Sequence, residues 1–229
     1  MQSLRRYTEP LRLLPPPLAI LSLVLVNLTV SGPVASSDEA KLSIKVAAVQ
    51  AGLRFYSAPD EFREHMGALV RRAAQEQPDL IVLPEDIGTG LLGLGLDAEM
   101  LASSSLPDIV AALTQQAEGV SALAAQCLPA TTALMLSRAP QVRQVYLETF
   151  AALARETSTW IAAGTILLPH DDSTRQVFNT FFLFGPDGQV AGTADKVNLI
   201  PLEGAAGLGL TPGDRQSVAP WVTPVATLG

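Results

Sequence analysis

Three residues of this sequence have types and positions that could act together in chemistry: Glu85, Lys196 and Glu203. Glu85 directly follows an apolar run and Pro84, while Lys196 follows a predicted hairpin and precedes Glu203 by seven positions. A carboxylate can accept a proton and return it to a leaving group. An ammonium can stabilise negative charge on an oxygen, and losing one such donor typically costs about 10²–10³-fold in rate. These residue types could therefore combine acid–base catalysis with stabilisation of an anion.

The elements that would position Glu85 are two short buried strands with a helix between them. Residues 44–50 and 80–83 are apolar runs of strand length. Between them, a helix is predicted to begin at residues 57–61, where Pro and acidic residues suit a first turn. Its apolar face repeats at helical spacing, through Phe62, Met66, Leu69, Val70 and Ala73. Ligands in such sheets bind at the carboxyl ends of strands, which is where Glu85 falls.

The remaining elements complete a predicted α/β domain with a mixed sheet. Residues 88–140 are apolar but irregular, and they are interpreted as an insert with helices near 107–118 and 119–127. A clearer helix is predicted over 141–157, and three further strands are predicted over 160–166, 177–184 and 189–194. The turn sequence Gly185-Pro186-Asp187-Gly188 joins the last two strands into a hairpin.

Four segments together resemble the signatures of the nitrilase superfamily of carbon–nitrogen hydrolases. Residues 80–85 resemble the strand that delivers a catalytic glutamate in that family. Phe178-Asn179-Thr180, the turn at 185–188 and residues 195–203 resemble the later strand hairpin that ends in a catalytic lysine, with a glutamate seven positions on. The strand at 45–50 fits the family's opening, and the resemblance covers residues 44–205.

The resemblance implies both a fold and a mechanism. The fold would be half of a nitrilase-type α-β-β-α sandwich, incomplete at its C-terminus. Glu85 would be the general base and acid, Lys196 the oxyanion stabiliser, and Glu203 the residue that orients Lys196 or the substrate. Asn179 would bind substrate, or would instead hold loop backbone. The substrate would be a small non-peptide amide or nitrile, no cofactor would be needed, and pairing into a homo-oligomer would be plausible.

The nucleophile that such a mechanism needs has no evident place in this sequence. The sequence has one cysteine, Cys127, which precedes Lys196 and lies in the predicted insert. The family's cysteine follows the lysine, so Cys127 is interpreted as a small buried hydrophobic residue. Three explanations are open: a truncated form of a working enzyme, a degenerate relative that only binds, or a missing part supplied by another chain. Truncation is favoured, and the chain alone is expected to be inactive.

Charge and composition argue against two kinds of site. The formal net charge is −7. Residues 1–37 hold three of the 15 basic residues and one of the 22 acidic ones, so the remainder is still more acidic. No basic stripe is available for phosphates, which argues against a nucleic-acid partner. The two histidines, His65 and His170, have no histidine or cysteine companion at ligand spacing, so no metal site is predicted.

The N-terminal segment has the features of an export signal. Residues 1–37 combine a basic start, an apolar run at 18–30 and a small-residue exit, which is typical of a signal peptide. A membrane anchor is the alternative, with membrane contact through residues 11–30. Residues 38–43 are then a linker, and residues 44–229 form the partial hydrolase domain with its insert at about 88–140. The protein is therefore expected outside the cytoplasm, either exported or membrane-anchored.

Two other functions remain open beside hydrolysis. One is a membrane-associated N-acyltransferase of the same fold, which the apolar insert and the N-terminal segment favour. Against it, only one apolar segment is present, whereas that branch of the family is polytopic. The other is a non-catalytic relative that uses the sandwich for binding or pairing.

Overall fold

The computed structural model describes residues 23–29, 43–103, 106–116, 128–171, 174–205, 207–214, 221–222 and 227–228. Most of the predicted leader, linker residues 38–42, the predicted helix at 119–127 and Cys127 lie outside these ranges. The predictions made for them therefore stay predictions.

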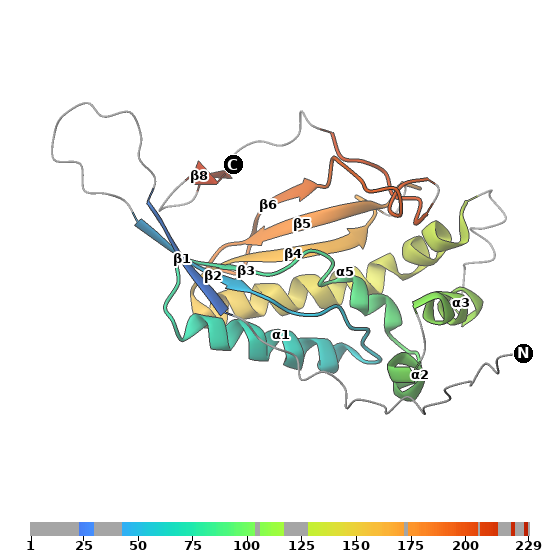
Figure 1. The fold of residues 1–229 in the computed structure, drawn as a ribbon, viewed down its shortest axis with the longest axis horizontal. Coiled ribbons are helices and arrows are strands. Elements are labelled where there is room, and N and C mark those ends of the chain that lie inside the picture. The colour runs from blue at the N-terminus through green and yellow to red at the C-terminus, as the bar shows by residue number, and fades with distance from the viewer. Residues whose placement is uncertain are drawn as a thin grey trace, which may run out of the picture.

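A mixed sheet of six strands organises the fold, one strand more than the sequence predicted (Figure 1). Its order follows the chain: β1 (Leu23–Thr29), β2 (Ser43–Val49), β3 (Leu80–Val82), β4 (Trp160–Leu168), β5 (Phe178–Phe184) and β6 (Val190–Asp195). The three central strands β2, β3 and β4 are parallel, and β1, β5 and β6 pair antiparallel. A separate short hairpin joins β7 (Trp221–Val222) to β8 (Thr227–Leu228). The α/β class and the mixed sheet are confirmed.

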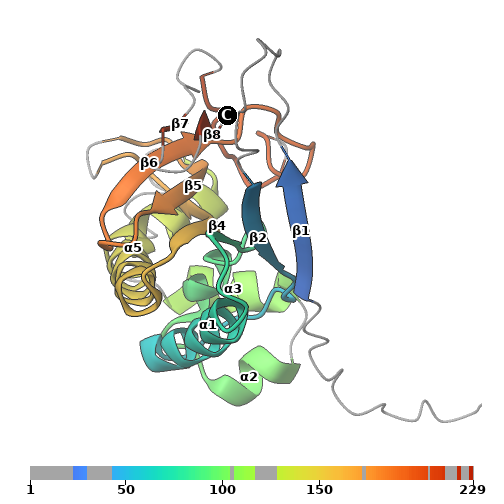
Figure 2. The same ribbon diagram turned by 90° about the vertical axis from the view of Figure 1, so that its left-hand side faces the viewer.

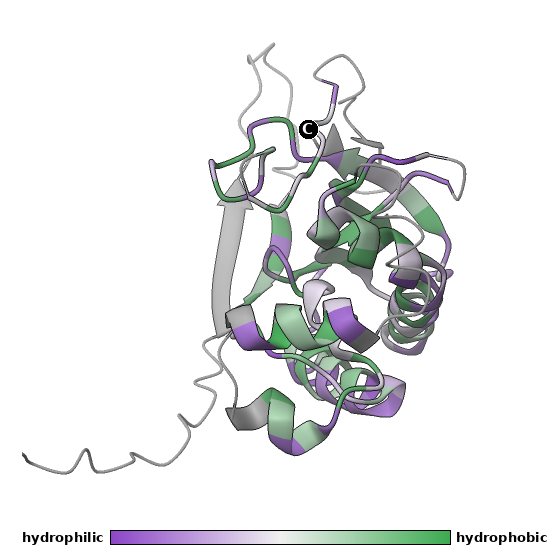
Figure 3. Cartoon of the chain, turned by 90° about the vertical axis from the view of Figure 1, so that its right-hand side faces the viewer, coloured by the Kyte–Doolittle hydropathy of each residue, from purple (hydrophilic) through white to green (hydrophobic). Residues whose placement is uncertain are grey.

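Two long helices, α1 (Pro59–Ala74) and α5 (Ala130–Thr157), cover one face of the sheet (Figures 1 and 2). Hydrophobic and hydrophilic residues share the surfaces of these helices, as Figure 3 shows. Their buried faces meet the sheet through an aromatic cluster, in which Tyr146 packs edge-on against Phe150 and lies beside Phe182. All three rings are buried. Burying a side chain of this kind stabilises the fold by about 1.5–3 kcal/mol, so the aromatic cluster holds α5 against the sheet.

Helix α5 is longer than the sequence predicted. It begins at Ala130 rather than Gln141 and runs through Pro140, which lacks an N–H and so omits one helical hydrogen bond. The prediction that the irregular stretch continues through residues 130–140 was therefore wrong, whereas the helix predicted near 107–118 is present as α3 (Leu106–Gln116). The first turns of α5 are retained because Ala133 and Leu134 pack with Ile109 and Leu113 of α3. Between β3 and α3, the chain also forms η1 (Thr89–Gly93) and α2 (Ala98–Ser103).

The apolar run near the N-terminus contributes a strand. Seven of its residues form β1, whose full length pairs with β2 from Leu23 opposite Val49 to Thr29 opposite Ser43. Leucine and valine dominate this segment, and β-branched residues such as valine favour strands. Among the described residues, none of the helices has both the length and the apolar character to cross a membrane. The signal peptide, the anchor and the location outside the cytoplasm remain predictions.

Candidate active site

A bulge in β4 makes room for the segment that carries Glu85. The pairing of β4 with β5 shifts register between Ala162 and Thr165, and Gly164 within the bulge has φ +70°. A Cβ at Gly164 would lie 2.0 Å from the carbonyl oxygen of Pro84, so only glycine allows this approach. Tyr146 supports the bulge from the helix layer, because its hydroxyl donates to the carbonyl of Ala163 at 2.8 Å. The bulge thus sets the position of the residue after Pro84.

The hairpin of β5 and β6 positions Lys196. Gly188 takes φ +77° in the predicted turn, which the structure places between the two strands. At the other end of the hairpin, the Lys196 N–H donates to the carbonyl of Asn179 at 2.9 Å. Asn179 and Lys196 are thereby held side by side at the end of the sheet.

A tight turn carries Glu203 back to the lysine. The backbone N–H of Glu203 donates to the carbonyl of Ile200 at 2.9 Å. The N–H of Ile200 in turn donates to Oε2 of Glu203, also at 2.9 Å. This reciprocal pair fixes the side chain of Glu203 in one orientation.

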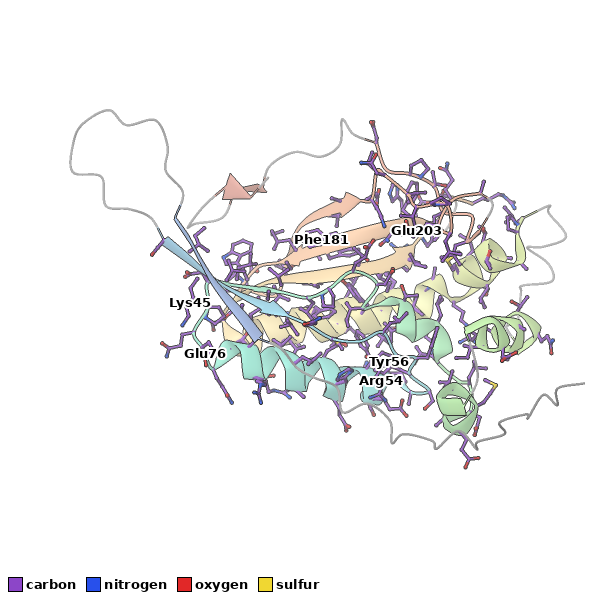
Figure 4. The ribbon with its side chains drawn as sticks, viewed as in Figure 1. Lys45, Arg54, Tyr56, Glu76, Phe181 and Glu203 are labelled. Carbon is purple, nitrogen blue, oxygen red and sulfur yellow. The ribbon has the colours of Figure 1, made fainter. Side chains whose placement is uncertain are left out.

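The four residues that the sequence singled out meet in one cluster. Lys196 Nζ lies 2.9 Å from Oε1 of Glu85 and 2.9 Å from Oε2 of Glu203. Asn179 Nδ2 donates to Oε1 of Glu85 at 2.8 Å and to Oε1 of Glu203 at 3.2 Å. The ammonium and the amide therefore both bridge the two carboxylates. Figure 4 shows Glu203 at the end of the sheet, beside the loops that follow β6.

The two carboxylates, Glu85 and Glu203, differ in how far they are buried. The side chain of Glu203 is 8% exposed and that of Glu85 is 49% exposed, while Asn179 is fully buried. A buried carboxylate with three donors is suited to holding its neighbours in place. An exposed carboxylate beside an ammonium can still reach a bound molecule. Glu203 and Asn179 are thus buried where they can hold their neighbours in place, whereas Glu85 is accessible to a bound molecule.

Electrostatics keep Lys196 charged and Glu203 ionised. Hydrogen bonds to Glu85 and then to Glu203 raise the pKa of Lys196 above its ordinary value. Burial alone would raise the pKa of Glu203, but hydrogen bonds from Lys196, the Ile200 N–H and Asn179 lower it below the ordinary value. The lysine is consequently an ammonium and Glu203 a carboxylate at neutral pH.

Sequence reasoning missed Asp86, a third carboxyl beside this cluster. Its backbone has φ +61°, a region that aspartate tolerates better than most residues. Its N–H donates to Oγ1 of Thr165 at 2.8 Å, and its carboxylate accepts from Thr89 at 3.2 Å. Burial, followed by the charge of Glu85, raises the pKa of Asp86. Its only signal in the sequence was its place next to Glu85.

A cavity of about 280 Å³ opens beside these polar groups. It lies between the loops after β6 and the first turns of α5, where Thr131 donates a hydrogen bond to the carbonyl of Leu208. Its wall is formed by Leu53, Phe55, Glu85, Asp86, Thr89, Leu92, Leu113, Thr131, Leu134, Met135, Leu167, Lys196, Ile200, Leu202, Glu203, Leu208 and Leu210. Three of the four predicted site residues, Glu85, Lys196 and Glu203, thus face one cavity.

His170 does not line this cavity. Its ring stacks on Phe178 at 3.9 Å between centroids, and its Nε2 lies 2.6 Å from Oδ2 of Asp195. Within the part of the chain that the structure describes, His, Cys, Asp and Glu form no group of three or more that could hold a metal ion.

The fold and the cluster define an α/β protein of the nitrilase type, with a Glu–Lys–Glu site at the end of its sheet. The chain belongs to the carbon–nitrogen hydrolase family, because the model of that family matches residues 45–218, well over half of the sequence. No curated protein matched the sequence in a separate comparison.

Solved structures that are similar to this chain include three members of this superfamily or family. Nit3 of Saccharomyces cerevisiae, a member of branch 10 of the nitrilase superfamily, is 19% identical, with a TM-score of 0.50 over 84% of this chain and 56% of that one. A carbon–nitrogen hydrolase from Helicobacter pylori G27 is 18% identical, with a TM-score of 0.49 over 80% of this chain and 49% of its own. A mutant of the amidase from Nesterenkonia sp. AN1 is 15% identical, with a TM-score of 0.49 over 80% of this chain and 54% of its own. This chain spans about half the length of these structures.

Proposed function

We propose that this site serves the hydrolysis of a carbon–nitrogen bond in a small non-peptide amide or nitrile. The observation that carries the proposal is the ammonium of Lys196, held 2.9 Å from both Glu85 and Glu203 at the wall of a cavity. Membership of the carbon–nitrogen hydrolase family supports it. The cluster supplies two of the three groups that such a reaction needs.

In the proposed reaction, a thiolate attacks the carbonyl carbon of the amide. The carbonyl oxygen gains negative charge, and Lys196 stabilises it. Glu85 accepts the thiol proton and passes it to the leaving nitrogen, which departs as ammonia or an amine. Glu85 then takes a proton from water as the water attacks the thioester, and returns it to the departing thiolate. The products are a carboxylic acid and ammonia or an amine.

The thiol is the group that this cluster does not contain. Cys127 is the one cysteine of the sequence, and it precedes Lys196 and lies outside the described residues. We propose that the nucleophile comes from polypeptide other than residues 1–229. Residues 1–229 alone are then expected to release no ammonia from simple amides.

The test uses the reading frame extended past Gly229, expressed as one protein and supplied with amides and nitriles. We expect ammonia release that thiol reagents block and that Glu85→Gln abolishes. Cys127→Ser is the matched control and should leave the rate unchanged. Turnover that survives Glu85→Gln, or that Cys127→Ser removes, would overturn this assignment of roles.

The sequence also favours a second candidate, a relative that binds amides without turning them over, because no cysteine follows Lys196. This candidate predicts that residues 1–229 bind amides and that Lys196→Met weakens the binding. It also predicts that no natural extended form releases ammonia.

A further inference from the structure

The cavity beside Lys196 is lined by a few polar groups and by a larger number of apolar side chains. The polar groups are the side chains of Glu85, Asp86, Lys196 and Glu203, with two threonines. Leucines, Phe55 and Met135 form most of the remaining wall. A molecule with its reacting group at Lys196 must therefore place the rest of its surface against hydrocarbon.

The described residues around the cavity offer no uncommitted basic group to an anionic substrate. Among the described residues that line it, Lys196 is the only basic one, and both Glu85 and Glu203 already bind it. Asp86 adds a third carboxyl to the same wall. A carboxylate on the substrate would enter without a counter-charge, and an unpaired charge in an apolar setting is strongly disfavoured.

The mouth of the cavity is also apolar. We define the apolar mouth as Leu53, Ile200 and Leu202, which line the cavity and are 54%, 53% and 64% exposed. Single exposed hydrophobic residues are ordinary on protein surfaces. Three around one opening form a patch, and such patches mark binding sites. The apolar surface thus continues from the inner wall out to solvent.

We infer that the substrate is an amide or nitrile with an uncharged, unbranched apolar acyl chain that extends from Lys196 to the apolar mouth. The inference rests on the proposed function and adds the substrate class. At about 30 Å³ for a water-sized group, a 280 Å³ cavity holds on the order of nine non-hydrogen atoms, which is enough for the roughly eight of hexanamide. Longer chains lie across the apolar mouth, and acyl chains that end in a carboxylate are rejected.

The test measures the binding of three amides to residues 1–229 by NMR titration: acetamide, hexanamide and the monoamide of adipic acid. Each buried methylene contributes about 0.8 kcal/mol, or about fourfold in affinity, so hexanamide should bind about 10²-fold tighter than acetamide. The adipic monoamide matches hexanamide in length but ends in a carboxylate. It should bind at least about tenfold more weakly than hexanamide.

Variants of the apolar mouth test whether the acyl chain binds there. Leu202→Ser should weaken hexanamide severalfold and leave acetamide unchanged. Val190→Ser is the matched control, because Val190 is also an exposed hydrophobic residue, 44% exposed, but does not line the cavity. Leu202→Lys should improve binding of the adipic monoamide, which a loss of folding could not do.

The outcomes separate this inference from the function on which it rests. Equal affinity for hexanamide and the adipic monoamide, or no dependence on chain length, would overturn the substrate class while the amide site stands. If none of the three amides binds, or if Lys196→Met leaves their binding unchanged, the proposed function itself fails.

Discussion

Replacing Glu203 by glutamine tests whether the buried carboxylate holds the cluster together. The change keeps the shape of the side chain but turns one oxygen into an NH₂ group. In the protein, Oε1 accepts from Asn179 and Lys196, and Oε2 accepts from the Ile200 N–H. Whichever oxygen is replaced, a donor then faces a donor.

The expected loss follows from these contacts. A hydrogen bond to a charged group contributes about 1.5–3 kcal/mol, and Glu203→Gln removes at least one and weakens the others. We therefore expect a loss of about 3 kcal/mol in the free energy of unfolding. For a chain of this size, that corresponds to a fall in Tm of about 6–12 °C.

Urea unfolding and thermal melts of residues 1–229 measure this change, with Glu148→Gln as the control. Glu148 is a surface residue of α5 with a side chain that is 52% exposed, and its loss should change Tm little. The pH dependence gives a second readout. Since the folded pKa of Glu203 is lowered, its stabilisation is present above the unfolded pKa and is lost as pH falls through the folded pKa. Glu203→Gln should lack this component. A melt within about 1 °C of wild type at neutral pH would refute the reasoning.

Three further changes probe the surroundings of this cluster. Gly164→Ala should lower the free energy of unfolding by about 1–3 kcal/mol, because the new Cβ meets the carbonyl of Pro84. Gly52→Ala is the control and should not lower it, because the space around Gly52 is open. Urea unfolding measures both variants. Asp86→Asn should raise Tm at neutral pH but not at acid pH, because burial raises the pKa of Asp86 in the folded protein and so disfavours its ionised form. Equal Tm differences at pH 3 and 7 would contradict this. Lys196→Met should weaken amide binding at least about tenfold in an NMR titration, and unchanged affinity would exclude its contact with the carbonyl.

The sequence was sufficient to select the residues of this cluster that lie close to their strands. Glu85 follows β3 and Lys196 follows β6, so a correct strand prediction also located each residue. That Glu85 and Lys196 lie close together could be anticipated only because the resemblance supplied the order of the strands. Asn179 came from the same hairpin, although its bond to Glu85 is a contact between residues 94 positions apart.

Other features depend on contacts that no local pattern contains. The conformation of Asp86 is set by the bulge in β4 and by Thr165, a residue 79 positions away. The early start of α5 was missed because Pro140 is typical of a helix boundary, and the turns before it are stabilised by α3 rather than by their own pattern. The place of β1 at the sheet edge likewise follows from pairing, since its composition also suits a leader.

The two carboxylates around Lys196 have a consequence for the fate of an acyl intermediate. If the proposed thioester forms, a free amine beside it would capture the acyl group as a stable amide and block any further turnover. Protonation removes the lone pair that such a capture needs. In the proposed reaction, Glu85 and Glu203 would protect Lys196 from acylation by raising its pKa, so that the acyl group would remain available to water. The same pairing should make Lys196 slow to react with amine-labelling reagents.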